Sequence, residues 1–104
     1  MPECYHQHID ARLLRLTELA IQKLDADPAL RVRLRENVSR WTAPRLRERW
    51  QHLLNLPWPL LRVRLLAKSE AGAALRQDAP LGGVLAPVER ARIMREFAHD
   101  ARAA

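Results

Sequence analysis

The stretch WTAPRLRERWQHLLNLPWP, residues 41–59, decides the fold that we expect for this chain. It holds all three tryptophans of the 104-residue sequence, together with a dense run of arginines. On a helix, Trp50 and Leu53 turn to one side with the other leucines, while the arginines turn outward. Pro57 and Pro59 stop that helix, because proline cannot continue the hydrogen-bond ladder. The stretch therefore predicts the hub of a helical core and a corner between two helices.

The composition favours helices over strands. The chain has eighteen leucines and sixteen alanines, against five valines, three isoleucines and two threonines. Leucine and alanine have high helix propensity, whereas β-branched residues favour strands. A chain of 104 residues has the length of one domain with one modest core. We therefore predict an all-α fold, a single compact domain of five to six short helices over residues 9–104, after a flexible N-terminal tail of residues 1–8.

Apolar periodicity and turn residues place the individual helices. The predicted helices run from Ile9 to Asp25, from Pro28 to Trp41, from Pro44 to the stop at Asn55, from Pro59 to Ala67, from Glu70 to Gln77, and onward from Pro87. Asp27, Thr42 and Ser69 are expected to cap the helices that follow them. Gly72 is expected to weaken its helix, by about 1 kcal/mol relative to alanine.

Apolar residues near the C-terminus are expected to complete the core. The loop of residues 78–86 carries Leu81, Val84 and Leu85, which we expect to pack at the core edge around a Gly-Gly turn. Helical spacing predicts that five residues of the last helix face inward, namely Ile93, Met94, Phe97, Ala98 and Ala101.

The excess of apolar residues on some helices predicts a protein partner. Leu14 and Ile21 widen the apolar face of the first predicted helix, and Val32 points away from the apolar stripe of the second. Trp58, between two prolines, is left unassigned and joins the candidates if it is exposed. Helices with more apolar surface than one chain can cover usually find it in a dimer or a second protein. We therefore predict another protein, a homodimer mate, or both as the partner.

The positive charge suggests an alternative function. Sixteen of the eighteen cationic residues are arginine, and the formal net charge is +6, which attracts phosphate backbones or acidic proteins. The candidate nucleic-acid-binding residues are Arg45, Arg49, Arg62 and Arg64, and on the last helix Arg92, Arg95 and Arg102. Arginine binds phosphate with a bidentate fork. No helix-turn-helix spacing and no exposed aromatic side chain for base stacking is evident, so a nucleic-acid-binding regulator is the alternative rather than the leading function.

Residues that carry chemistry are sparse. The few hydroxyl groups mostly suit helix caps, the four histidines form no HExxH pair, and the carboxylates are interleaved with arginine. We therefore predict no enzyme activity and no cofactor. Cys4, His6 and His8 alternate, so an extended strand would point them the same way, and thiolate and imidazole suit zinc or copper. Their fourth ligand is undefined, which makes metal binding the third hypothesis.

The sequence predicts a cytoplasmic protein. One cysteine allows no intrachain disulfide. No apolar run approaches the roughly 20 residues of a membrane span, and the N-terminus MPECYHQH lacks the pattern of a signal peptide.

Three segments carry a resemblance to a known group. They are DPALRVRLRENVSRW at residues 27–41, ERWQHLLNLPW at 48–58, and LRQDAPLGGVL at 75–85, followed by PVER and an Arg-Ile-Met-Arg helix. Between about Asp27 and Phe97 the chain resembles a group of small, functionally uncharacterised, all-helical bacterial proteins, often encoded beside toxin-like genes. The resemblance implies an antitoxin-like or regulatory role. The chain departs from that pattern at Ala86, where a capping serine is expected, and at Asp78-Ala79. It also shows no separate DNA-binding segment before Ile9, although some members of the group carry one.

Overall fold

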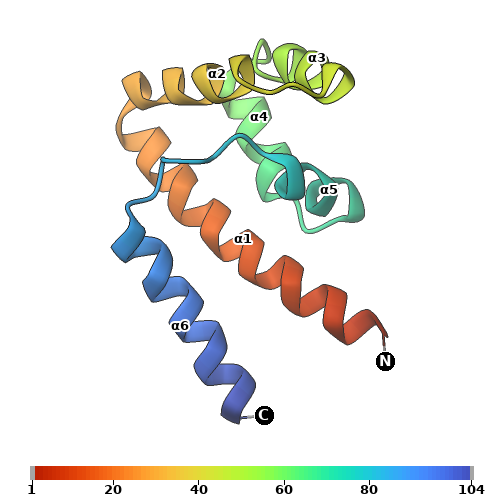
Figure 1. Cartoon of the computed structure of the whole chain (residues 1–104), viewed down its shortest axis with the longest axis vertical. Helices are drawn as coiled ribbons and strands as arrows, with labels where there is room; N and C mark the ends of the chain where they lie inside the picture. The colour runs from red at the N-terminus through yellow and green to blue at the C-terminus, as the bar shows by residue number, and fades with distance from the viewer. Residues whose placement is uncertain (1, 104) are drawn as a thin grey trace.

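A computed structural model shows an all-helical chain; it describes the backbone of residues 2–103 and the side chains of residues 10–98 (Figure 1). The elements in order are α1 (Pro2–Ala26), the 3-10 helix η1 (Pro28–Arg31), α2 (Val32–Ser39), α3 (Pro44–Leu53), α4 (Trp58–Leu66), α5 (Glu70–Asp78) and α6 (Pro87–Ala103). No strand occurs among the described residues. The prediction of a single all-α domain is confirmed.

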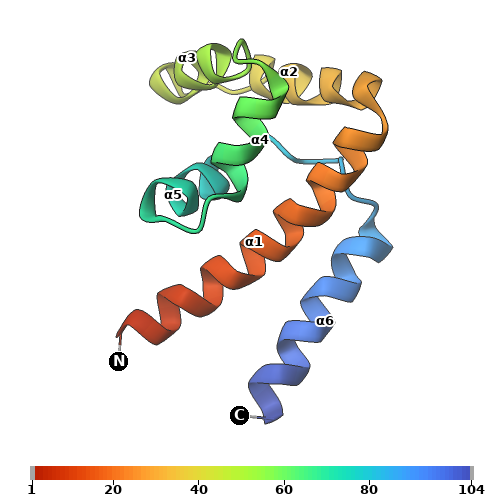
Figure 2. The same ribbon diagram turned by 180° about the vertical axis from the view of Figure 1, so that it is seen from behind.

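Helix α1 is the element on which the others pack. Its 25 residues run along much of the 41 Å long axis of the molecule. Helix α6 lies antiparallel beside it, whereas α4 and α5 pack against its other side. Helices α2 and α3 run across the end of the molecule opposite the two chain ends, with α3 on the side of α4 and α5 (Figures 1 and 2). The first and last described segments therefore lie at the same end of the molecule.

The core forms two clusters along α1. The larger contains Ile21, Val38, Trp50, Leu61, Leu65 and Leu75. The smaller contains Ala20, Leu24, Leu34 and Val84, with Leu81 and Leu85 packed against it. Trp50 is 1% exposed, so its predicted place in the core is confirmed. The expected packing of the 78–86 loop against the core edge is also confirmed.

The observed helix boundaries correct several predictions. Helix α1 begins at Pro2 rather than Ile9, and proline suits a first helical turn because its missing N–H would be unpaired there. The helix thus runs through residues that we assigned to a tail, and the domain limits of 1–8 and 9–104 stay a prediction. The second predicted helix is divided into η1 and α2 and ends at Ser39.

The predicted caps have mixed outcomes. Asp27 Oδ1 accepts the Ala29 N–H at 3.2 Å, and Ser69 Oγ accepts the Gly72 N–H at 3.1 Å, so both caps are confirmed. Thr42 is wrong as a cap, because Ala43 occupies the N-cap position of α3 and no side chain caps that helix. Pro44 explains the shift, since a residue before proline is pushed out of the helical region and becomes the boundary.

The side chain of Glu89 fixes the first turn of α6 against α1. Lys23 Nζ lies 2.7 Å from Glu89 Oε1, which also accepts the Ala86 N–H at 2.8 Å. These two contacts lower the pKa of Glu89, and the second is half of a capping box. Along the rest of α6, Ile93 is buried but Met94 and Ala98 are exposed, contrary to prediction. The inward face is narrow because α6 packs mainly on α1; Ala101 lies outside the described side chains.

Gly72 closes the corner between α4 and α5. A Cβ built there would overlap the carbonyl oxygen of Ala67 and lie 2.9 Å from its carbonyl carbon. We therefore expect Gly72→Ala to lower the free energy of unfolding by about 1–3 kcal/mol, although the same change in an open helix stabilises by about 1 kcal/mol. Gly82→Ala is the control, since its Cβ would meet only Asn37 Nδ2 at 3.9 Å. Urea unfolding checks both variants, and a stabilised Gly72→Ala protein would contradict the close contact.

Candidate functional site

An apolar groove opens between the start of α2 and the start of α4. We call it the Val32 groove; its lining residues are Pro28, Arg31, Val32, Leu34, Arg35, Leu54, Leu56, Trp58 and Leu61. It encloses about 210 Å³. Val32 stands at this groove with 56% of its surface exposed. The groove brings together Val32 and Trp58, two of the four predicted partner-binding residues.

The other two predicted partner-binding residues lie elsewhere. Ile21 is buried in the larger core cluster, so its assignment to a partner surface is wrong. The physical reason is that α4 and α5 of the same chain cover that face of α1 (Figure 1). Leu14 is partly buried and does not line the groove.

Trp58 is held rigidly at the groove by charged neighbours. Its indole N–H donates to Asp25 Oδ1 at 2.6 Å. Arg62 donates two hydrogen bonds to the same carboxylate, from Nε at 3.2 Å and from Nη2 at 2.8 Å. The guanidinium carbon of Arg31 lies 4.5 Å from the Trp58 ring centroid, a cation–π distance. Trp58 therefore presents a fixed, half-buried ring rather than a mobile one.

The contacts of Asp25 make this corner sensitive to acid. The Trp58 N–H first, and then the Arg62 guanidinium, lower the pKa of Asp25 below its ordinary value of 3.8. A carboxylate with a lowered pKa stabilises the fold fully above the unfolded-state pKa, and that stabilisation is lost as pH falls through the lowered value. At pH 6 we expect Asp25→Asn to have a lower free energy of unfolding than wild type. This difference is expected to shrink as the pH falls below 3.8.

Urea titrations at several pH values measure that difference. Comparing the two proteins at each pH isolates Asp25, because Glu89, whose pKa is also lowered, is common to both. A difference that stays constant from pH 6 to well below pH 3.8 would show that ionised Asp25 does not stabilise the corner.

Two arginines give the groove a positive rim. Arg31 Nε donates to the Leu24 carbonyl at 3.2 Å, and Arg35 Nη2 donates to the Leu54 carbonyl at 2.9 Å. Both carbonyls lie at the C-terminal end of a helix, Leu24 in α1 and Leu54 after α3. The helix dipole favours a cation at this end. The groove thus combines an apolar floor with fixed positive charge.

The predicted nucleic-acid-binding arginines separate into two surfaces. Arg49 and Arg64 line one hollow of about 430 Å³ beside the start of α5, and Arg45 is exposed on α3. Arg62 is instead paired with Asp25. Arg92 and Arg95 are exposed on α6, away from the first group, and the side chain of Arg102 lies outside those described. The structure therefore does not form one continuous basic surface from these residues.

Two further predictions concern metal binding and the membrane. The side chains of Cys4, His6 and His8 lie outside them, so that hypothesis stays a prediction. Within residues 10–98 no group of three or more His, Cys, Asp or Glu side chains could hold a metal ion. None of the described helices has the length and apolarity to cross a membrane.

Arg76 is a buried charge that the sequence did not reveal. It is 3% exposed, and all five of its N–H groups are used. Nε and Nη2 bind the Asp10 carboxylate in a fork at 2.8–3.0 Å, and Nη1 donates to the Leu65 and Ala67 carbonyls at 3.0 and 2.7 Å. Arg76 thereby ties α5 to α1 and to the end of α4. Its partner Asp10 is 66 residues away in sequence, so no local pattern could signal the pair.

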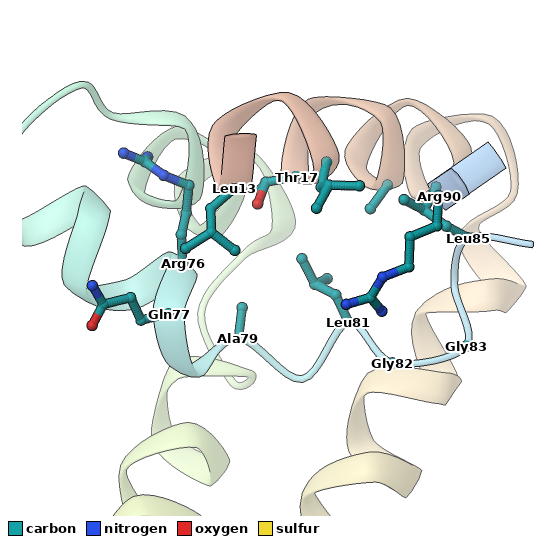
Figure 3. A pocket seen from close by; sticks show the side chains of 12 residues that line it. Leu13, Thr17, Arg76, Gln77, Ala79, Leu81, Gly82, Gly83, Leu85 and Arg90 are labelled. Carbon is teal, nitrogen blue, oxygen red and sulfur yellow. The ribbon is translucent and has the colours of Figure 1, made fainter. Parts of the chain in front are cut away.

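A second cleft lies beside Arg76. We call it the α1 cleft; it encloses about 210 Å³, and among its lining residues are Leu13, Leu16, Thr17, Arg76, Leu81, Leu85 and Arg90 (Figure 3). Residues 75–85, one of the segments that carry the resemblance, supply much of its wall.

No protein-family model, no curated protein and no solved structure matches the chain. The antitoxin-like role implied by the resemblance therefore stays a prediction.

Proposed function

We propose that this chain is a small, non-catalytic protein–protein interaction module, antitoxin-like or regulatory, that binds an acidic segment of another protein at the Val32 groove. The observation that supports this most is Val32 itself, a valine 56% exposed on an apolar groove that also exposes the fixed ring of Trp58. An exposed apolar side chain beside an apolar hollow gains by burial against a partner.

The charge of the rim supports an acidic partner. Arg31 and Arg35 are held at the groove by their carbonyl contacts, and the whole chain carries a formal charge of +6. Complementary charge speeds association and selects among partners. A segment with one or two apolar side chains flanked by Asp or Glu matches both features of the groove.

Peptide display against the intact chain tests this proposal. We expect the selected peptides to combine acidic residues with a large apolar residue. Fluorescence polarisation then compares wild type with Val32→Glu, which places a carboxylate at the groove and is expected to weaken binding at least about tenfold, through the penalty on burying a charge.

Val88→Glu is the matched control. Val88 is 71% exposed on α6 and does not line the groove, so this variant adds the same charge and is expected to bind within about twofold of wild type. Peptides that bind both variants equally well, or a selection without acidic peptides, would contradict the proposal. Sedimentation of the free chain separates the homodimer alternative, since self-association through the groove would be lost in Val32→Glu.

The nucleic-acid alternative keeps one supporting observation. Arg49 and Arg64 line the same hollow, and neither forms an ion pair with another described residue. Polarisation with random duplex DNA across a salt series tests it. If these arginines contact phosphates, the Arg49→Ala, Arg64→Ala double variant lowers the slope of log affinity against log salt by about two. No binding at low salt removes this alternative.

A further inference from the structure

Thr17 places an unused hydroxyl in the α1 cleft. The side chain is only 2% exposed, yet it lines the cleft, and its hydroxyl forms no hydrogen bond within the described part of the chain. Threonine in a helix commonly satisfies its hydroxyl on a carbonyl of the preceding turn. Because Thr17 lines the cleft, its hydroxyl can donate to or accept from a polar atom that enters there.

Arg90 supplies a charge to the same cleft. The two arginines that line it differ in their availability. The N–H groups of Arg76 are all taken by Asp10 and two carbonyls, whereas the Arg90 guanidinium has no ion pair with the described residues. Figure 3 shows the Arg90 side chain reaching from α6 to lie beside Leu81, apart from Thr17 on the α1 side. The cleft therefore offers two separate polar points.

The wall of the cleft is fixed before any ligand enters. Asn37 Nδ2 donates to the Pro80 carbonyl at 2.9 Å and to the Gly82 carbonyl at 2.8 Å. Gly83 turns the chain with a φ of 79°, which glycine adopts without strain. The loop that faces α1 is thus clamped to α2. Such pre-formed, mainly apolar cavities with a few placed polar groups are typical of small-molecule sites.

We propose that the α1 cleft binds a small aromatic or branched monocarboxylic acid that carries a second hydrogen-bonding group. The carboxylate pairs with Arg90, and the second group bonds the Thr17 hydroxyl. The apolar body lies against Leu13, Leu16 and Leu81. The size agrees, since a cavity of about 150 Å³ accommodates benzene, and this cleft has about 210 Å³. Its site and ligand are independent of the Val32 groove.

Calorimetric titration of the full chain with three probes tests the proposal. The probes are 3-(4-hydroxyphenyl)propionate, the amide of that acid, and 3-phenylpropionate, which lacks the hydroxyl. We expect the hydroxylated acid to bind most tightly. The amide loses the charge-assisted contact and is expected to bind about tenfold more weakly. The acid without the hydroxyl is expected to bind several-fold more weakly.

Two variants assign the contacts. Arg90→Gln is expected to reduce the preference for acid over amide to near unity. Arg92→Gln is the control and is expected to leave this preference unchanged, because Arg92 is exposed on the same helix and does not line the cleft. Thr17→Val is expected to remove the preference for the hydroxylated acid. Because no protein group bonds this hydroxyl, Thr17→Val should keep the wild-type thermal midpoint or raise it. Absence of binding by all three probes at millimolar concentration, equal binding of acid and amide, or variants that change neither preference would overturn the proposal.

Discussion

Replacing Arg76 by alanine is expected to lower the free energy of unfolding by about 3 kcal/mol or more. The change removes five hydrogen bonds and leaves the Asp10 carboxylate and the Leu65 and Ala67 carbonyls without their donor. Breaking a buried pair from one side is strongly destabilising because the remaining charge keeps its desolvation penalty. Such a change typically costs about 3–5 kcal/mol. The Asp10 side chain keeps 33% of its surface exposed, so we expect a loss near the lower end of that range. Denaturant unfolding measures it.

Arg76→Lys and Arg92→Ala sharpen this test. Lysine keeps the charge but lacks the planar fork, so it cannot bind Asp10 and both carbonyls together, and we expect most of the stability loss to remain. Arg92 is exposed, and its removal is expected to change stability by no more than about 0.5 kcal/mol. An Arg76→Ala protein as stable as Arg92→Ala would show that the buried guanidinium does not hold α5 against α1.

Replacing Trp50 by alanine is expected to destabilise the fold by about 3–5 kcal/mol. Trp50 is the largest of the fully buried side chains and belongs to the larger core cluster. Truncation removes apolar contact and opens a cavity that α3 and α4 can only partly close. Thermal or urea unfolding checks the size of the loss. A loss below about 1 kcal/mol would contradict the central place of Trp50.

Trp50→Phe separates packing from hydrogen bonding at the same position. The indole N–H of Trp50 is buried without a partner, which is unfavourable by about 1–3 kcal/mol. Phenylalanine keeps an aromatic ring but lacks this unpaired N–H. Removing the unpaired N–H therefore offsets part of the stability that is lost because the side chain is smaller. We expect Trp50→Phe to lose less than half as much stability as Trp50→Ala. An equal loss would mean that the N–H has a partner in solution.

The features that periodicity and capping rules describe were predictable from the sequence. The helix class, the inward side of Trp50 and the caps at Asp27 and Ser69 follow from residue type and local spacing. Thr42 was misjudged because the stronger backbone effect of Pro44 moved the boundary by one residue.

Contacts between distant residues were not predictable from a local pattern. Arg76 and Asp10, Trp58 and Asp25, and Asn37 and the 80–82 loop are each separated by more than thirty residues. Gly72 was read as a weak point in a helix, yet the close approach of Ala67 makes it necessary there. Ile21 was expected on a partner surface because its own helix does not reveal that α4 and α5 cover it.

Two of the residues that line the Val32 groove were candidates from the sequence, but the groove itself was not predictable. Val32 was a candidate because it departs from the helical stripe, and Trp58 because its position was open. Their meeting at one groove depends on the crossing of α2 over the start of α4, which local spacing does not encode. The arginine rim depends on other contacts between elements, since Arg35 on α2 reaches the Leu54 carbonyl at the end of α3.

Amide chemical-shift mapping of the labelled chain, titrated with an acidic peptide selected by display, tests the central claim most directly. Our account predicts that the largest shifts fall within residues 28–35 and 54–61, the two segments that contain the lining residues of the Val32 groove. The same titration of Val32→Glu is expected to show these shifts only at much higher peptide concentration. Shifts centred on α6, or around Arg49 and Arg64 with the groove unchanged, would contradict it.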